Sequence, residues 1–201
     1  MNHHRTLART LMALGLALGT AAAQPIPAVP HAWPDPPLTS WNAANGQIPS
    51  AGTVPDRAEL ERRCPPLELP TSPAARAIAA AGWVPFFYFD RELVADDVEV
   101  LAGMTGADPI CRPMGYNLFV FVGGRFAGTL SPRPMDSRAD LSSGVVRLLP
   151  HDAISVEITR YAASDPPCCP SSRDTVRFSI DRSQALAVVA PTEVRRTRGG
   201  K

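Results

Sequence analysis

The chain has 201 residues, 20 of them basic and 19 acidic, and its formal net charge at pH 7 is +1. This near-neutral balance creates no long-range field that would attract nucleic acid or an anionic membrane, so neither is a predicted partner. The length suits one compact domain with an additional irregular segment.

Residues 1–23 have the pattern of a secretory signal peptide. A basic start with Arg5 and Arg9 is followed by the apolar run 11–18 and by small residues that end at Ala23. The apolar run is shorter than the roughly 18 residues that suggest a membrane-spanning helix. We therefore expect export, a mature chain that begins at Gln24, and no transmembrane anchor in that mature chain.

Residues 24–63 are interpreted as a proline-rich extended arm. The stretch 24–73 holds 12 of the 22 prolines of the chain, and proline breaks helices and removes donors from sheets. Two possibilities stay open. Trp33 and Trp41 dock the arm onto the domain, or the arm is a disordered linker.

The first predicted regular element is a short helix in the segment SPAARAIAAAG, which runs from Ser72 to Gly82. Ser72 suits the N-cap, Pro73 suits the first helical position, and Gly82 suits a left-handed exit. The folded domain is therefore expected to begin near Cys64 and to extend to residue 190.

Strand patterns follow the helix. The segment YNLFVFVGGRFAGTL predicts a hairpin, because Gly123 and Gly124 permit the tight turn that matches strand twist. Alternating apolar and polar residues predict strands at 154–159 and 175–180, and QALAVVAP adds a final strand. The predicted fold class is α+β, mainly β, with an antiparallel sheet of about five to seven strands and one short N-terminal helix. Residues 191–201 are predicted to be a basic, flexible tail.

Four cysteines, Cys64, Cys111, Cys168 and Cys169, indicate disulfides in an exported chain. Adjacent Cα atoms lie about 3.8 Å apart, which is below the usual minimum of about 4.4 Å for a disulfide. We therefore expect Cys168 and Cys169 each to bond a distant partner, Cys64 or Cys111, in either order. No metal site or cofactor is predicted, because adjacent thiols are poorly placed to hold one zinc ion together.

The hairpin FVFVGGRFAGTLSP and the loop RYAASDPPCCPSS resemble the LppP/LprE lipoprotein family of actinobacterial and cyanobacterial envelopes. The run MGYNLFVFV…GRFAGTLSPRPMDSR is most similar to cyanobacterial-type members, and the resemblance covers roughly residues 82–181. It implies a bacterial periplasmic or extracellular domain of no established biochemical activity. The chain departs from the family name, because its first cysteine is Cys64 and no lipid-accepting cysteine follows the signal segment.

Sequence motifs of common hydrolases, metalloproteases and phosphate-binding loops are absent. We therefore expect a non-catalytic binding or structural module and not an enzyme. The alternatives are a secreted hydrolase that uses acidic residues, and a thiol or soft-metal-binding protein. The available carboxylates are Asp90, Asp96, Asp97 and Glu99, while His151 is expected to be an exposed loop residue.

The tripeptide Arg-Pro-Met occurs twice, at 112–114 and 133–135. Arg112, Arg133 and Arg138 are therefore candidates for a cationic patch that binds a carboxylate or phosphate of an anionic envelope component. The alternative is that Asp136 or Asp140 pairs with these arginines and only orders the loop.

Overall fold

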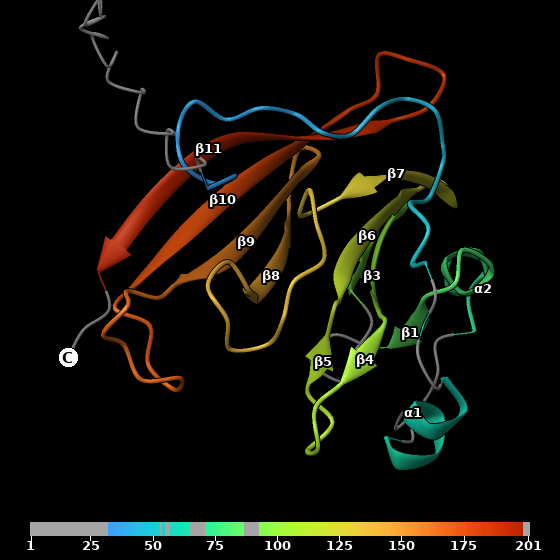
Figure 1. The fold of residues 1–201 in the computed structure, drawn as a ribbon. Coiled ribbons are helices and arrows are strands. Elements are labelled where there is room, and N and C mark those ends of the chain that lie inside the picture. Colours follow the sequence, from blue (N-terminus) through green and yellow to red (C-terminus); the bar gives the residue numbers. More distant parts are fainter. Residues whose placement is uncertain (1–31, 53, 55–56, 65–70, 87–92, 199–201) are drawn as a thin grey trace, which may run out of the picture. The chain divides into compact units, whose positions relative to one another are not determined.

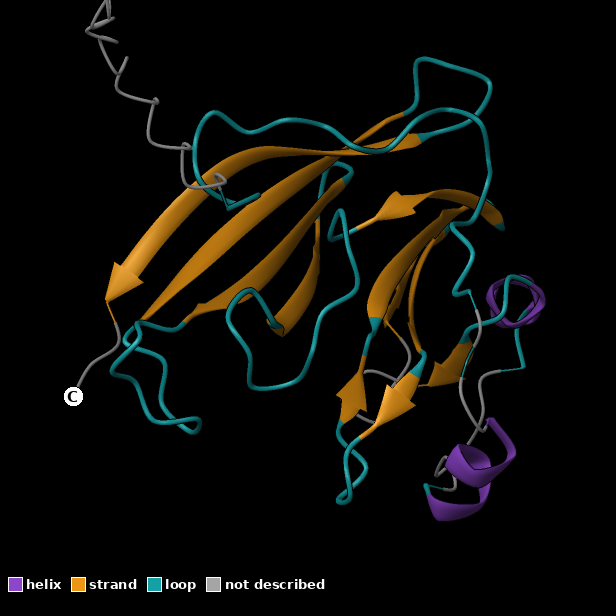
Figure 2. Cartoon of the chain, in the orientation of Figure 1, coloured by secondary structure: helices purple, strands orange, loops and turns teal. Residues whose placement is uncertain are grey.

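The computed structural model describes residues 32–52, 54, 57–64, 71–86 and 93–198 (Figure 1). The predicted signal peptide and the candidate carboxylate Asp90 lie outside these residues. The described residues form two short helices, two antiparallel sheets and a two-stranded ribbon (Figure 2). The mainly β composition is confirmed. The prediction of one sheet and one helix is corrected, because the described residues form two larger sheets and two helices.

The first sheet contains five strands in the order β1-β3-β6-β7, with β2 paired to β3. The predicted hairpin joins β6 to β7, and Gly123 and Gly124 have positive φ angles of 55° and 74° as its turn requires. The strands of this sheet are β1 Val84–Phe86, β2 Leu93–Ala95, β3 Val98–Met104, β6 Asn117–Val122 and β7 Arg125–Thr129. The short strands β4 Gly106–Ala107 and β5 Pro113–Met114 pair separately as the ribbon.

The second sheet contains four consecutive strands, joined as hairpins in the order β11-β10-β9-β8. They are β8 Ser143–Leu149, β9 Ala153–Arg160, β10 Ser172–Asp181 and β11 Val188–Arg198. The sequence pattern did not predict β8, whose alternation is interrupted where its register shifts between Ser143 and Val146. Alternation identifies a buried strand face but not the strand that pairs with it, so one sheet was predicted where two exist.

The predicted tail is wrong for residues 191–198, because β11 continues to Arg198. Its register pairs Arg196 with Asp174 and Arg198 with Ser172 on β10. Arg196 donates hydrogen bonds to the fully buried carboxylate of Asp174. This ion pair holds the end of β11 on β10, so the basic residues predicted to be a tail belong to the strand.

Helix α2, Pro73–Ala80, is the predicted helix. The Ser72 hydroxyl accepts a hydrogen bond from the Ala75 backbone N–H at 3.1 Å, which caps the first turn. Helix α1, Arg57–Arg63, was not predicted and lies inside the segment assigned to the arm. It buries Leu60 in the main core and carries ion pairs between residues three and four apart.

Strand β6 separates two hydrophobic clusters, which explains why it is buried on both faces. Leu118, Val120 and Val122 belong to the main core, together with residues of the second sheet such as Val156 and Phe178. Phe119 and Phe121 point to the other side, where they pack with Ile78 of α2, Trp83 and Leu101. The second sheet and α2 therefore cover opposite faces of the first sheet.

The described part of the arm is docked, and the linker possibility is excluded for residues 32–52. Trp33 and Trp41 pack edge to face with ring centroids 5.2 Å apart, and Trp41 packs on Phe178 at 6.0 Å. The Asn42 amide donates to the backbone oxygens of Thr129 and Val189, both at 2.9 Å. Asn42 therefore connects β7 of the first sheet to β11 of the second.

The cysteine pairing differs from the predicted one. Cys64 at the end of α1 bonds Cys111 after β4, with Cα atoms 5.5 Å apart, and Cys168 bonds Cys169. The prediction of two long bridges to the adjacent cysteines is therefore wrong. Cys168 and Cys169 lie in the loop between β9 and β10 of the second sheet, whereas Cys64 directly follows α1 and Cys111 lies in the loop between the ribbon strands β4 and β5.

Candidate functional site

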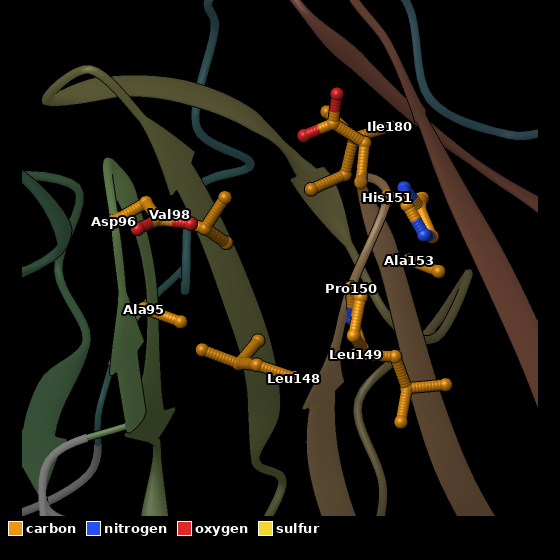
Figure 3. A pocket seen from close by; sticks show the side chains of 10 residues that line it. Ala95, Asp96, Val98, Leu148, Leu149, Pro150, His151, Ala153 and Ile180 are labelled. Atoms are coloured by element: carbon orange, nitrogen blue, oxygen red, sulfur yellow. The ribbon is translucent and has the colours of Figure 1, made fainter.

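A small pocket of about 60 Å³ lies between the β2–β3 turn and the β8–β9 turn. Figure 3 shows Asp96 and Val98 on one side and Pro150 and His151 on the other. Ala95, Val98, Leu148, Leu149 and Ile180 make its walls mainly apolar. This volume is well below the roughly 300–1,000 Å³ of typical ligand pockets, so the pocket does not enclose a ligand of that class.

Three residues at this pocket adopt left-handed backbone conformations without being glycine. The φ angles are 53° for Asp96, 62° for His151 and 53° for Asp152. Asp and His tolerate this region better than most residues, and the turns of the two hairpins require it. His151 is exposed, as expected for a loop histidine.

Arg182 forms ion pairs with two carboxylates beside the pocket. Its terminal nitrogens donate to both oxygens of Asp97 at 2.8 Å, and its Nε donates to Asp152 at 2.9 Å. The hydrogen bond from Arg182 lowers the pKa of Asp97 below its ordinary value. The lowered pKa keeps Asp97 ionised near neutral pH, so Asp97 is not poised to act as a general acid.

The candidate carboxylate on β3, Glu99, stabilises the start of α2. Glu99 accepts a hydrogen bond from the Ser72 hydroxyl at 2.7 Å, so it orients the residue that caps the helix. Among the described residues, no group of three or more His, Cys, Asp or Glu side chains is placed to hold a metal ion.

The three candidate arginines are not brought to one point. The Ser137 N–H donates to the Pro113 oxygen, and Tyr116 pairs with Met135, so the two Arg-Pro-Met segments run antiparallel. This pairing places Arg112 and Arg138 at one end of the two segments and Arg133 at the other end.

The predicted aspartate partners of these arginines are engaged elsewhere. Arg112 pairs with Asp108, a residue that the sequence pattern did not indicate. Asp136 accepts from the Gly115 N–H at 2.7 Å, and Asp140 accepts from the Tyr161 N–H at 2.9 Å. Anion binding by these arginines stays a prediction.

A second set of arginines was missed in the sequence. Arg173 and Arg177 occupy exposed positions of β10, Arg195 lies on the neighbouring strand β11, and Arg147 lies on β8, two strands from β10. The alternation at 175–180 could have revealed them, because its polar residues, such as Arg177, mark the face of the strand that points to solvent.

Comparison with known proteins gives a match to one protein family. Residues 90–183 match the model of the LppP/LprE lipoprotein family. This match confirms the resemblance seen in the hairpin and the cysteine loop, and it spans β2 to β10. The family is described as a lipoprotein family, which suggests association with the cell envelope. No curated protein and no solved structure matches the chain. None of the described helices is long and apolar enough to cross a bilayer.

Proposed function

We propose that this protein is an exported, non-catalytic binding module of the bacterial cell envelope, with an anionic envelope component as its partner. The observation that carries the proposal is the match of residues 90–183 to an envelope lipoprotein family. The bond between Cys64 and Cys111 supports it, because such disulfides persist in oxidising compartments outside the cytoplasm.

The engagement of the acidic side chains supports a binding role over a hydrolytic one. Asp97 and Asp152 share Arg182, and Glu99 holds the helix cap through Ser72. These carboxylates therefore stabilise turns and a helix end. Arg133 and Arg138 are exposed, and their guanidinium groups pair with no residue that the structure describes, which supports an anionic partner.

The first experiment separates export and binding. The full chain is expressed in a bacterium with a Sec pathway, and the intact mass of the exported form is measured. We expect the mass of a chain that begins at Gln24 with both disulfides oxidised. The purified protein is then mixed with insoluble cell-wall material, and we expect it to sediment with that material. A protein that stays in the cytoplasm or in the supernatant contradicts the proposal.

The second experiment tests the hydrolase alternative. The protein is incubated with the same wall material, and released sugars and peptides are measured by mass spectrometry against the Asp152→Asn variant. The binding-module proposal expects no release above the buffer control for either protein. Release that the Asp152→Asn change abolishes would instead establish an enzyme that uses acidic residues.

A further inference from the structure

The outer face of the second sheet carries a regular array of arginine and hydroxyl side chains. On β10 the residues that point away from the core are Arg173, Thr175 and Arg177, because Asp174, Val176 and Phe178 between them are buried. The strand register extends this alternation into rows across the sheet. The rows are Arg147–Ser155–Arg177–Glu193, Glu157–Thr175–Arg195 and Thr159–Arg173–Thr197.

The charges on this outer face do not balance. Four arginines and two glutamates give 4 − 2 = +2. Glu157 is shared by Arg147 at 3.3 Å and Arg173 at 3.8 Å, and Glu193 pairs with Arg195 at 2.9 Å. The Arg177 guanidinium makes no hydrogen bond or ion pair with any residue that the structure describes.

These arginines contribute little to the fold. The Arg173 and Arg195 side chains are 55% and 80% exposed, and ion pairs between exposed side chains contribute little to stability. The two helices pack against other elements, since α2 contacts β1 and β3 while α1 contacts β4. Within the residues that the structure describes, neither helix covers this face, and its arginines are accessible to a partner.

We propose that the outer face of β8–β11 docks a carboxylated polysaccharide of the cell envelope. This inference rests on the proposed function and names its partner class and its surface. A guanidinium binds a carboxylate through two parallel hydrogen bonds, and Arg177 has both available. Arg173 and Arg177 are four residues apart on one strand, which is roughly 13 Å, and Arg147 and Arg177 are two strands apart, which is roughly 10 Å. No small anion spans these distances, whereas an extended polymer with repeated carboxylates does.

The composition of the face favours a polysaccharide over a lipid surface. The half-buried Thr175 and the exposed Thr197 lie beside the arginines, and hydroxyl groups both donate to and accept from sugar hydroxyls. Docking on a bilayer requires exposed apolar side chains that enter the acyl boundary. Among the described residues, the large hydrophobic side chains that are exposed are Val94 and Ile110, which lie on other elements.

The test compares two charge-matched double variants of the full chain. Arg173→Gln/Arg177→Gln removes two cations from the outer face, and Arg76→Gln/Arg125→Gln removes two exposed cations elsewhere. Binding to polygalacturonate is measured by isothermal titration calorimetry at low salt, with neutral dextran as the control polymer. We expect the outer-face variant to lose at least tenfold in affinity, the other variant to lose less than twofold, and dextran not to bind. Thermal unfolding of both variants should match that of the parent protein.

Three results would overturn the assignment. Equal losses in the two variants mean that net charge and not this face determines binding. Binding to phosphatidylglycerol vesicles that depends on Arg173 and Arg177, without binding to polygalacturonate, means that the partner is a membrane. Sedimentation of the outer-face variant with wall material as efficiently as the parent refutes this face alone and leaves the proposed function standing. Failure of the parent protein to sediment refutes the proposed function itself.

Discussion

Asn42 joins the two sheets through hydrogen bonds to their backbones. Its oxygen accepts from the Thr129 N–H at 2.9 Å, while its nitrogen donates to two backbone oxygens of different sheets. Gly128, with φ at 145°, allows this approach, because a Cβ atom there would lie 2.5 Å from the Asn42 amide. The close fit requires both residues together.

Replacing Asn42 by alanine should therefore destabilise the protein by about 2 kcal/mol, the typical cost of leaving buried backbone groups without partners. The free energy of unfolding is measured by urea denaturation followed by circular dichroism. Asn45→Ala is the matched control, since Asn45 is exposed and accepts only from the nearby Gln47 N–H. Equal effects of the two changes would contradict this role for Asn42.

An ion-pair network at the end of the second sheet makes a second residue-scale contribution. The buried Asp174 carboxylate accepts from Arg160 at 2.7 Å and from Arg196 at 2.7 and 2.8 Å. Asp35 of the arm pairs with the same two arginines. The hydrogen bond from Arg160 lowers the pKa of Asp35, so the arm is held by a carboxylate that ionises more readily than usual.

This lowered pKa sets a direction for the pH dependence of stability. The stabilisation by Asp35 is fully present above its ordinary pKa of about 3.9 and is lost as the pH falls through the lowered folded-state pKa. Asp35→Asn should therefore lower the melting temperature at pH 7, and the difference from the parent should shrink below pH 3.9. The exposed Asp96→Asn variant is the control and should show a smaller change at pH 7. A difference that persists unchanged to pH 2 would contradict the argument.

At the scale of elements, the two disulfides close loops of very different length. The bond between Cys64 and Cys111 ties α1 to the segment after β4 across 47 residues, and Arg63 adds a hydrogen bond to the Ala107 oxygen at 2.9 Å. The bond between Cys168 and Cys169 closes no loop of intervening residues. The two disulfides therefore differ in how much they restrict the unfolded chain.

Chain-entropy arithmetic assigns about 4 kcal/mol to a loop of this longer size. The Cys64→Ser/Cys111→Ser variant should lose about that much free energy of unfolding, and the Cys168→Ser/Cys169→Ser variant should lose less than about 1 kcal/mol. Urea denaturation measures both values. Non-reducing peptide mapping of the parent protein checks the pairing. Peptides that link residue 64 or 111 to residue 168 or 169 would restore the pairing expected from the sequence.

At the scale of the whole described chain, the arm acts as a structural part of the domain. It supplies Trp33 and Trp41 to the main core, and Ile48 and Ala51 to the cluster under α2. Trp83 of that cluster donates from Nε1 to the Pro49 oxygen at 2.7 Å. One segment therefore contacts both hydrophobic clusters and the edges of both sheets.

Residues 32–52 should be required for cooperative unfolding. From the sequence alone, a chain that begins near Glu61 is expected to fold, since α2 and the predicted strands follow that point. The contacts of the arm lead to the opposite expectation. A chain that begins at Arg57 should show a broadened, non-cooperative urea transition by circular dichroism, whereas a chain that begins at Ala32 should unfold cooperatively. A sharp transition with an unchanged midpoint in the shorter chain would refute this role of the arm.

The sequence by itself determined the elements whose signals are local. Ser72, Pro73 and Gly82 marked the ends of α2, because a cap, a preset φ and a left-handed exit are properties of a few neighbouring residues. The Gly123-Gly124 turn and the alternation in β9 and β10 were predictable for the same reason. The cysteine loop also carried the family resemblance that the match over residues 90–183 confirms.

Only the tertiary structure decided which distant segments meet. Four cysteines allow three pairings, and no local pattern selects the bond between Cys64 and Cys111. The division into two sheets, the docking of Trp41 and Asn42, and the alignment of Arg147 with Arg177 depend on strand register. Register is set by packing and hydrogen bonds between segments that are far apart in the chain. A periodic pattern states which side of a strand is buried, but it does not state against which other strand.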